Sequence, residues 1–582
     1  MSAISKSSLR SRLIDFNRDF LDPSTPLSCL GTGEIGGKAE GLVSIRDALH
    51  AELPGEKFPS ISVEIPPMVV ICTDIFDAFM EGNGLYDIAS SELGDARIAR
   101  AFQKSDLPFE ILGDLRSIVE DVHTPLAIRS SSMLEDTMKA PFAGIYATKM
   151  IPNNEYDPDV RFRHLVEAIK FIYASTFKRS AKDYRTTIGH NDRDEKMAVI
   201  IQQLVGKRYH TRFYPELSGV ARSYNYYPMK PAKPEDGVVS LALGLGKTVV
   251  EGGVCWQYSP AYPSLEPPFG SVENLLDGTQ TEFWAVNMGE PLAYDPTSET
   301  EYLLKDDILA AENDGSLDYL VSTYNAISSR LSIGMPFKGP RALTFAPLLA
   351  LEKVPFNDLI KALLFTCEHT FHSPVELEFA MTFDPGQFGL VQVRGMAVPT
   401  DIVHVSEEEL DGEAVLIASE SVLGNGSLEN VSDVIYTRPE NFELKHSKSI
   451  VPELQRINSQ LLSRGVPYVL IVFGRLGTTD PWLGIPVQWG QVCGAKVIVE
   501  TTQENVRVEL SQGSHYFHNM INLGVKYFSV PFTSSRQIDW AWLDAQEALE
   551  ETDFVRHVRL PAPLDIRVDG RRGRGVIYKP GR

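Results

Sequence analysis

One arginine and three serines are adjacent in one stretch of the sequence, IRSSSMLEDTMKAPFAGIY (128–146). Arg129 follows a short apolar run, the hydroxyls of Ser130 and Ser131 come next, and a turn of small residues ends at Gly144. A guanidinium matches phosphate oxygens with two parallel hydrogen bonds, and clustered hydroxyls add further donors. The stretch therefore predicts a binding site for an anionic group.

A glycine-rich stretch, GTGEIGGKAEGL (31–42), surrounds the single lysine Lys38. Gly36 and Gly37 allow backbone N–H groups to approach phosphate oxygens closely, and the lysine supplies a positive charge. On the residues alone, an ordinary turn is the alternative to phosphate binding.

A second Gly-Lys pair, Gly246 and Lys247, lies in LALGLGKTVVEGG (241–253). The P-loop pattern GxxxxGK[ST] requires its first glycine at position 241, where the sequence has Leu241. A leucine side chain obstructs the tight turn of that loop, so the residues disfavour a P-loop ATPase.

Two carboxylates lie close together in VELEFAMTFDPGQFGLVQVRGM (375–396). Strand alternation places Glu376 and Glu378 on one face, and Gln392 and Arg394 form a second same-face pair across a turn. Neighbouring carboxylates repel unless a cation lies between them, and oxygen ligands at this spacing suit Mg²⁺. A solvated strand face is the alternative that the residues leave open.

An apolar strand in MAVIIQQLV (197–205) ends in polar Gln202 and Gln203. Such a strand offers an adenine both apolar contact and hydrogen bonds along its edge. An ordinary strand with a polar exit fits the residues equally well.

Taken together, in this order and spacing, these motifs resemble the nucleotide-binding domain of pyruvate phosphate dikinase and phosphoenolpyruvate synthase, which has an ATP-grasp fold. The family patterns are GGK, the arginine-serine signature, VQxMV followed by GVAFS, GLGExVVxG, and (D/E)IE(W/F)A paired with LxxLQxR. The GVAFS strand is similar to LSGVARSYN (217–225), and Lys247 stands where the family usually carries an acid.

The resemblance implies ATP and Mg²⁺ as cofactors and gives the residues their expected roles. Lys38 and Arg129 would clamp the phosphates, Gln392 and Arg394 would position the transferring group, and Glu376 and Glu378 would hold Mg²⁺. The implied nucleotide-binding residues are Gly36, Gly37, Ser130, Ser131, Gln202, Leu204, Gly246 and Lys247.

A Ser-His pair in SQGSHYFHNMINLGVKYFSV (511–530) is similar to the phosphohistidine loop of the swivelling domain in full dikinases. His515 precedes Gly524 by the spacing of that loop, and a GRLGTTDPWLGIP loop (474–486) comes before it, as in some dikinase-like proteins. A neutral histidine is nucleophilic, and a helix N-terminus favours an attached phosphate. The usual double glycine is missing, so a phosphoryl-carrying and a structural or substrate-facing role both stay open.

The composition sets limits on partners and location. The chain has 582 residues and a formal charge of −22, which argues against wholesale binding to nucleic acid or an anionic membrane. No stretch reaches the roughly 18 apolar residues of a membrane span. The five cysteines are dispersed, which fits a reducing cytoplasm. We therefore expect a cytoplasmic protein with neither a nucleic-acid nor a membrane partner.

The pattern of the chain predicts an α/β or α+β architecture of two domains. A helical arm is expected over 1–30, an ATP-grasp nucleotide-binding domain over 31–400, and a smaller α/β C-terminal domain over 401–582. That last domain is either a degenerate swivelling domain or an acceptor-binding one. The expected strands are 197–204, 237–243, 375–383, 389–393, 468–474 and 495–500. The expected helices are 75–82, 162–177 and 346–367.

The sequence thus predicts ATP- and Mg²⁺-dependent phosphoryl or pyrophosphoryl transfer by a short dikinase-like enzyme. About 180 residues follow position 400, too few for the phosphoenolpyruvate/pyruvate barrel, so pyruvate is not expected as a substrate of this chain alone. The acceptor stays open among His515, a histidine of a separate subunit and a small molecule, and so does assembly as a homo-oligomer or as part of a multicomponent kinase. The alternative is a regulatory subunit that binds ATP without turnover, which Lys247 favours and the intact carboxylate pair opposes.

Overall fold

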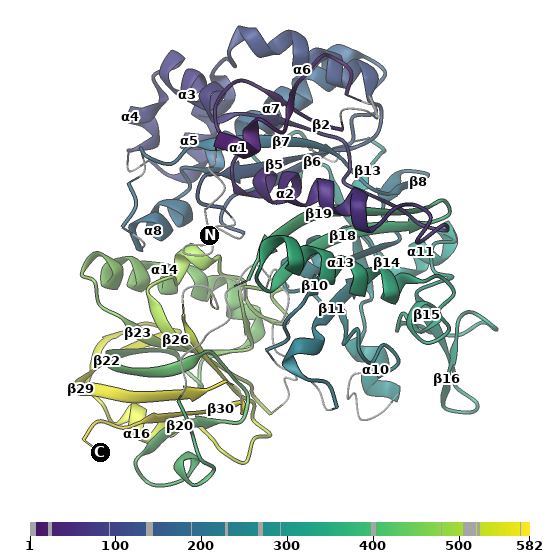
Figure 1. The fold of residues 1–582 in the computed structure, drawn as a ribbon. Helices are drawn as coiled ribbons and strands as arrows, with labels where there is room; N and C mark the ends of the chain where they lie inside the picture. Colours follow the sequence, from purple (N-terminus) through teal and green to yellow (C-terminus); the bar gives the residue numbers. More distant parts are fainter. Residues whose placement is uncertain are drawn as a thin grey trace.

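The computed structural model describes most of the chain, and Figure 1 shows its helices and strands. The described residues are 7–20, 26–91, 93–135, 144–187, 189–191, 193–226, 228, 231–265, 272–290, 293–396, 403–478, 480–504, 520, 524–570 and 572–581. His515 lies outside them.

The first sheet has six strands in the order β1-β2-β4-β7-β5-β6. Their bounds are Ile14–Asp15 (β1), Leu27–Leu30 (β2), Met68–Ile71 (β4), Met197–Gln203 (β7), Leu126–Ser132 (β5) and Thr148–Ile151 (β6). Every residue of β2, β4 and β5 is buried, as expected for strands that are covered on both faces. Val69 and Ile128 pack toward the α3–α7 side, whereas Met68 and Ile200 pack toward α2.

The helices around this sheet form two layers (Figure 1). One layer holds Thr73–Gly82 (α3), Leu85–Ala89 (α4), Asp95–Lys104 (α5), Phe109–Asp121 (α6) and Pro158–Ser175 (α7). The other is Gly37–Glu52 (α2), whose apolar side chains also pack against the second sheet. The helix α2 therefore joins the two sheets, and its N-terminus carries the GGK motif.

The second sheet has the order β12-β11-β10-β18-β19-β3. Its strands are Trp256–Tyr258 (β12), Val238–Ala242 (β11), Leu217–Arg222 (β10), Val375–Phe383 (β18), Gly386–Gly395 (β19) and Ser62–Glu64 (β3). Leu377 and Val393 belong to the core that α2 and the helix Phe356–Phe371 (α13) form with this sheet. Strand alternation turns Glu376 and Glu378 to the opposite face, away from those helices.

Smaller elements complete this part of the chain. One sheet, β14-β13-β9-β8, consists of Leu303–Asp307, Glu282–Asn287, Arg212–Tyr214 and Lys207–Tyr209, and another, β16-β15-β17, consists of Arg330–Ile333, Val321–Asn325 and Arg341–Leu343. The short helices are Ser7–Arg10 (α1), Arg179–Thr187 (α8), Lys247–Val250 (α9), Val272–Gly278 (α10), Ile308–Asp314 (α11) and Ala346–Leu349 (α12).

The C-terminal domain is built on a nine-stranded sheet with the order β20-β30-β29-β22-β23-β26-β27-β21, to which β28 adds at β29. The strands are Val415–Ser419 (β20), Arg574–Tyr578 (β30), Val555–Asp569 (β29), Asn425–Thr437 (β22), Tyr468–Phe473 (β23), Ala495–Thr501 (β26), Lys526–Val530 (β27), Val422–Leu423 (β21) and Ala548–Glu551 (β28). The helices are Ser447–Ser463 (α14) and Trp540–Asp544 (α16). The four strands β22, β23, β26 and β27 are parallel, and the remaining pairings are antiparallel.

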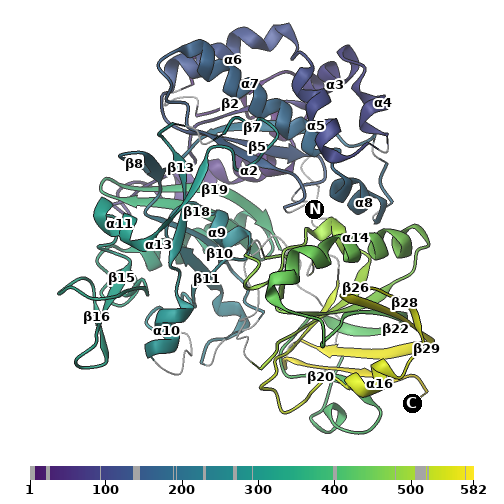
Figure 2. The same cartoon turned by 180° about the vertical axis from the view of Figure 1, so that it is seen from behind.

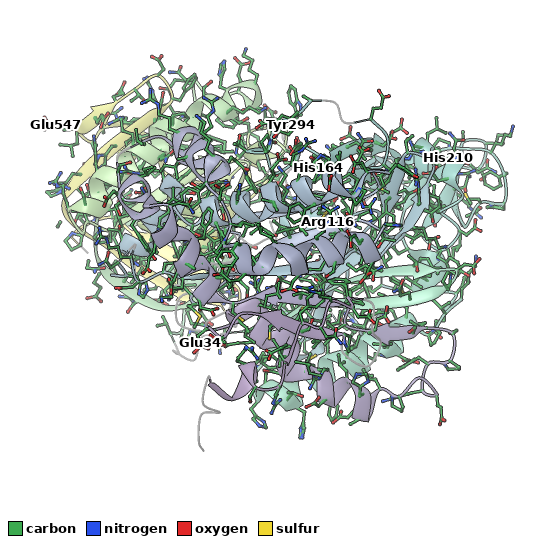
Figure 3. The ribbon with its side chains drawn as sticks, turned by 90° about the horizontal axis from the view of Figure 1, so that it is seen from above. Glu34, Arg116, His164, His210, Tyr294 and Glu547 are labelled. Atoms are coloured by element: carbon green, nitrogen blue, oxygen red, sulfur yellow. The ribbon has the colours of Figure 1, made fainter. Side chains whose placement is uncertain are left out.

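Figure 2 shows the same arrangement from behind, with the C-terminal domain beside both N-terminal sheets. In Figure 3, Glu547 of this domain and His210 of the β8–β9 hairpin lie at opposite ends of the molecule. Among the described helices, none has the length and apolar character needed to cross a membrane.

The expected strands are confirmed as β7, β11, β18, β19, β23 and β26, and two expected helices as α3 and α7. The helix expected over 346–367 is instead two helices, α12 and α13. Pro355 lies between them and lacks the N–H that a continuous helix requires.

The mixed α/β character and the further C-terminal sheet domain agree with expectation, but the described residues of 1–30 (7–20 and 26–30) differ from it. Where a helical arm was expected, α1 has four residues and β1 and β2 pair with the first sheet. The run Leu27–Leu30 is short and fully buried, so it satisfies its backbone hydrogen bonds in a sheet. Residues 397–402 are not described, so the division of the chain at residue 400 stays a prediction.

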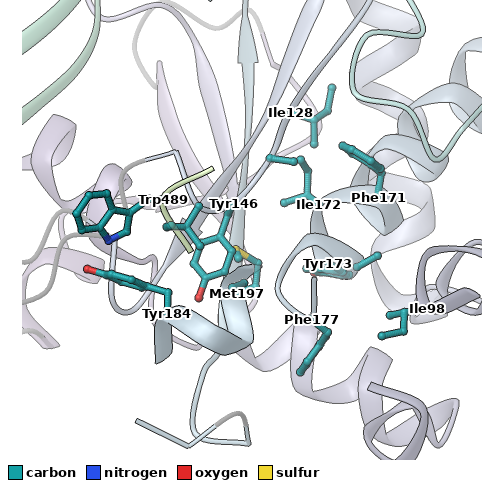
Figure 4. Close-up of a cluster of buried hydrophobic side chains, with 14 of the residues drawn as sticks. Ile98, Ile128, Tyr146, Phe171, Ile172, Tyr173, Phe177, Tyr184, Met197 and Trp489 are labelled. Carbon is teal, nitrogen blue, oxygen red and sulfur yellow. The ribbon is translucent and has the colours of Figure 1, made fainter. Parts of the chain in front are cut away.

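One hydrophobic cluster extends from the first sheet into the C-terminal domain. Figure 4 shows Trp489 beside Tyr184 and Tyr146, with Tyr173 and Phe177 deeper in the same cluster. Gly490 lies so close to α8 that an added Cβ would be 2.0 Å from the carbonyl oxygen of Ser180. The C-terminal domain therefore shares part of its core with the first sheet.

Candidate functional site

A cavity of about 360 Å³ lies where the two N-terminal sheets meet the C-terminal domain. Its volume is in the range that small-molecule ligands occupy in proteins. The predicted site residues that line it are Lys38, Arg129, Gln202, Leu204, Gly246, Lys247, Glu378 and Gln392. The predicted residues Gly36, Gly37, Ser130, Ser131, Glu376 and Arg394 are not among its lining residues.

Arg129 is the centre of the hydrogen-bonding network in this cavity. It lies on β5, it is 6% exposed, and its Nη2 donates to Gln392 Oε1 at 2.8 Å. Its Nη1 donates to the carbonyl oxygen of Val391 at 2.7 Å and to Gln202 Oε1 at 3.3 Å. The carboxylate of Glu378 lies 3.5 Å from Nη2. Arg129 thus joins the two sheets and is held in one orientation.

Lys38 is held by a residue that sequence reasoning did not single out, Glu135. The two side chains form an ion pair and are 8% and 1% exposed. Ser130 Oγ accepts from Lys38 at 3.1 Å and donates to Glu135 Oε1 at 3.0 Å, and the N–H of Ser132 donates to Glu135 Oε2 at 2.9 Å. A buried, paired ammonium at a cavity wall has a fixed position, which is the arrangement needed to meet an incoming anion.

The first glycine of the GGK motif, Gly36, allows the backbone before α2 to approach the backbone of β5 closely. Gly36 has a φ of 75°, and a Cβ added there would lie 1.7 Å from the carbonyl oxygen of Ser131. Ser131 Oγ donates to the carbonyl oxygen of Ile35 at 2.8 Å and accepts from the N–H of Ala39 at 3.1 Å. Ser131 therefore fastens the start of α2 to β5, which places Lys38 at the cavity.

The residues on β10, β18 and β19 form two successive rows across the second sheet. Val220, Glu378 and Gln392 are directly opposite one another, and all three line the cavity. The next row consists of Arg222, Glu376 and Arg394. Only the first row faces the cavity, so two of the four predicted polar residues of β18 and β19, Glu378 and Gln392, line the cavity, and the other two do not.

Lys247 lies at the cavity wall at the start of α9. It forms ion pairs with Glu251 and with Glu299, the latter at 3.6 Å, and its Nζ lies 5.8 Å from the ring centroid of Trp284. Burial alone lowers the pKa of Lys247, but Glu299 and Glu251 outweigh it and the pKa is raised. Leu241, the position that a P-loop glycine would take, is a buried residue inside β11.

The remaining wall of the cavity is apolar. It is formed by Met150, Leu204, Leu245 and Leu303, of which Leu204 and Leu245 lie in predicted motifs. Gln202 and Gln203 line the cavity next to them. An apolar slot bordered by polar groups suits the flat, hydrogen-bonding ring of a nucleobase.

The C-terminal domain contributes residues that were not predicted as part of this site. Gly477, Thr478 and the run from Pro486 to Trp489 line the cavity. Arg475 Nη1 donates to the carbonyl oxygen of Gly252 at 3.1 Å, which ties this segment to the loop after α9. The only sequence signal was the likeness of the GRLGTTDPWLGIP loop to other dikinase-like chains.

His515 and its neighbours in 505–519 lie outside the described residues, so the expectation for His515 stays a prediction. The strand before this segment, β26, ends at Thr501, whose carbonyl oxygen accepts from the N–H of Gly474 at 2.8 Å. Within the described parts of the chain, no group of three or more histidines, cysteines or acidic residues is arranged to hold a metal ion.

We expect the stability of the protein to fall as the pH rises from about 5 to about 7. Burial raises the pKa of Glu195 from 4.5 to about 7, and it likewise raises that of Glu500 to about 7. In this window the folded state holds protons that the unfolded state has released, so deprotonation costs folding free energy. Each group contributes roughly 3 kcal/mol across the window.

Urea unfolding at several pH values measures this slope, and Glu195→Gln should remove about half of it because it deletes one of two similar groups. Glu120→Gln, at an exposed position on α6, is the control and should leave the slope unchanged. A Glu195→Gln protein with the slope of the unmodified protein would show that Glu195 is not the titrating group.

Comparisons with known proteins show what the chain is similar to. The model of the pyruvate phosphate dikinase AMP/ATP-binding domain family matches residues 32–413. The chain is 26% identical over 200 residues to YvkC, an uncharacterised phosphotransferase of Bacillus subtilis, covering 34% of this chain and 21% of that protein. It is 30% identical over 164 residues to a rifampicin phosphotransferase of Streptomyces sviceus (27% and 16%). It is 24% identical over 242 residues to a phosphoenolpyruvate synthase of Aeropyrum pernix (38% and 26%). The matched segments thus span about a quarter or less of each of these relatives.

Proposed function

Since this chain belongs to the pyruvate phosphate dikinase AMP/ATP-binding domain family, we propose that it transfers a phosphoryl or pyrophosphoryl group from ATP to an acceptor. The observation that carries the proposal is the convergence of Lys38, Arg129, Glu378 and Gln392 on one cavity. These residues come from three separate segments of the sequence, 31–42, 128–146 and 375–396. Two cations, a carboxylate and an amide around one cavity match the needs of a triphosphate with its metal.

In the proposed reaction the protein acts by position and charge. Lys38 and Arg129 bind phosphate oxygens, and Gln392 orients Arg129 through the hydrogen bond between them. Such fixed cations stabilise the charge that develops on the transferring group. The apolar wall at Met150, Leu204 and Leu303 receives the adenine.

The residues that face the cavity fit a magnesium ion. Mg²⁺ is usually held by one or two carboxylates together with substrate phosphates, and Glu378 faces the cavity beside Arg129. When bound, the ion would neutralise phosphate charge. Glu376, the other predicted ligand, lies in the row behind.

The acceptor is proposed to be His515, a histidine of a separate subunit, or a small molecule bound next to the C-terminal segment. In that segment Gly477, Thr478 and Pro486 to Trp489 line the cavity, and an acceptor bound next to them would lie close to the proposed phosphate site. The proposed location is the cytoplasm, where ATP is available.

Incubation with ATP and Mg²⁺ and a panel of acceptor metabolites tests the proposal. We expect either AMP, for pyrophosphoryl transfer, or ADP, for phosphoryl transfer, together with labelled acceptor. An acid-labile protein label that is lost in His515→Ala and kept in His518→Ala would assign the carrier histidine. ATP binding without any turnover across the panel would instead favour the regulatory-subunit alternative.

A further inference from the structure

Three charged side chains form a continuous row beside the proposed transfer site. Arg222 on β10, Glu376 on β18 and Arg394 on β19 are direct cross-strand neighbours. Arg222 Nε donates to Glu376 Oε2 at 2.5 Å, and Arg394 Nε donates to Glu376 Oε1 at 2.9 Å. Each carboxylate oxygen of Glu376 thus accepts from a different guanidinium.

This row is buried and closed toward the cavity. The side chains of Arg222, Glu376 and Arg394 are each 3% exposed, and none of them lines the cavity. The side chain of Glu378, one row closer, is 15% exposed and does line it. The two carboxylates that sequence reasoning treated as one metal-binding pair therefore have different surroundings.

Arg222 is a second position, besides Lys247, at which the residue type differs from the family pattern. The strand LSGVARSYN resembles GVAFS, and the position of the family phenylalanine is Arg222. A guanidinium stays charged at every accessible pH, so Arg222 is a permanent cation beside Glu376. The row already carries two positive charges against one negative charge, and a divalent ion added to it would be repelled in a poorly solvated place.

We propose that Arg222 takes the place of a metal ion at Glu376, so that the nucleotide complex of this chain holds a single divalent cation, bound by Glu378 and the phosphates. The inference rests on the proposed function, because it presumes that the cavity binds a nucleotide. Glu376 then has a positioning role: it holds Arg394 next to the transfer site and is not a metal ligand.

Manganese bound to the full chain with a non-hydrolysable ATP analogue tests this by electron paramagnetic resonance. The unmodified protein should bind one Mn²⁺ per chain. Glu378→Gln should weaken that Mn²⁺ at least about tenfold, since it removes the ligand itself. Glu376→Gln is the matched control and should leave the Mn²⁺ affinity unchanged.

Two substitutions of Arg222 then distinguish the effect of its charge from the effect of its side-chain shape. Arg222→Phe, which restores the family residue, should raise the stoichiometry to two Mn²⁺ per chain because Glu376 loses one of its two cations. Arg222→Lys keeps the charge and should keep one Mn²⁺. Thermal unfolding of both variants shows whether they are folded.

Different results would overturn the inference and the proposed function on which it rests. A nucleotide complex of the unmodified protein with two Mn²⁺, or equal loss of Mn²⁺ in the two glutamine variants, would overturn the inference alone. This holds even if Arg222→Phe does not fold, because neither result uses that variant. Failure of the unmodified protein to bind the nucleotide analogue by calorimetry would overturn the proposed function, and the inference with it.

Discussion

Replacing Arg129 by methionine is expected to lower kcat/KM for ATP turnover about a thousandfold, the usual scale for loss of a cationic phosphate contact in phosphoryl transfer. Arg129 contacts both sheets at the cavity, through the carbonyl oxygen of Val391 and the side chains of Gln202 and Gln392. Methionine keeps much of its length but provides no donor. Glu378 would also lose its neighbouring cation, so the proposed metal site would shift as well.

Steady-state assays of AMP or ADP release measure this effect, and Arg161→Met is the matched control. Arg161 on α7 is 5% exposed, and its Nε and Nη2 donate to the carbonyl oxygen of Val119 at 3.0 and 2.8 Å. Its loss leaves buried backbone groups unpaired but does not touch the cavity. Equal losses of kcat/KM in both variants would mean that Arg129 acts only on stability.

The substitution Gly36→Ala is expected to destabilise the protein by about 4 kcal/mol or more, an exceptional cost for one methyl group. Two independent causes contribute to this loss of stability. Gly36 has a positive φ, which an L-residue rarely adopts, and the new Cβ would lie 1.7 Å from the carbonyl oxygen of Ser131. Relief of that clash requires the start of α2 to move off β5, and Lys38 moves with it.

Urea unfolding and nucleotide binding together measure this effect. Gly55→Ala is the control, because an added Cβ there meets nothing within 4 Å. It should change the free energy of unfolding by no more than about 0.5 kcal/mol. A folded Gly36→Ala protein with unchanged nucleotide affinity would show that the close approach of the GGK turn to β5 is dispensable.

Much of the cavity could be predicted because its residues lie in motifs with local signals. The Lys38 turn has glycines on both sides, Arg129 follows an apolar run, and Glu378 is at the right position in an alternating strand. Each of these signals comes from a few consecutive residues. The strands that carry Gln202 and Glu378 were predicted nearly to their ends, and the middle of the strand that carries Gln392 was predicted. The break before Pro355 was missed: the apolar pattern of 346–367 was interpreted as one continuous helix, although proline lacks the N–H that such a helix needs.

The rest depends on contacts that a linear pattern does not record. Arg222 meets Glu376 only because β10 and β18 pair in one particular register, and neither residue signals this by itself. Glu135 is next to Asp136 in the sequence, and this pair is visible there. The bond of Glu135 to Lys38, however, joins positions that are 97 residues apart. Gly477, Thr478 and the run from Pro486 to Trp489 reach the cavity through the packing of a second domain, which local sequence does not specify.

The hydrophobic cluster that contains Tyr184 and Trp489 has a consequence for how the protein unfolds. These two side chains belong to one continuous core, although Tyr184 lies on α8 and Trp489 lies in the C-terminal domain. Separating the domains exposes apolar surface on both sides and opens the contact of Gly490 with Ser180. We therefore expect the two parts to unfold together, and a fragment cut between them to present a hydrophobic face that favours aggregation.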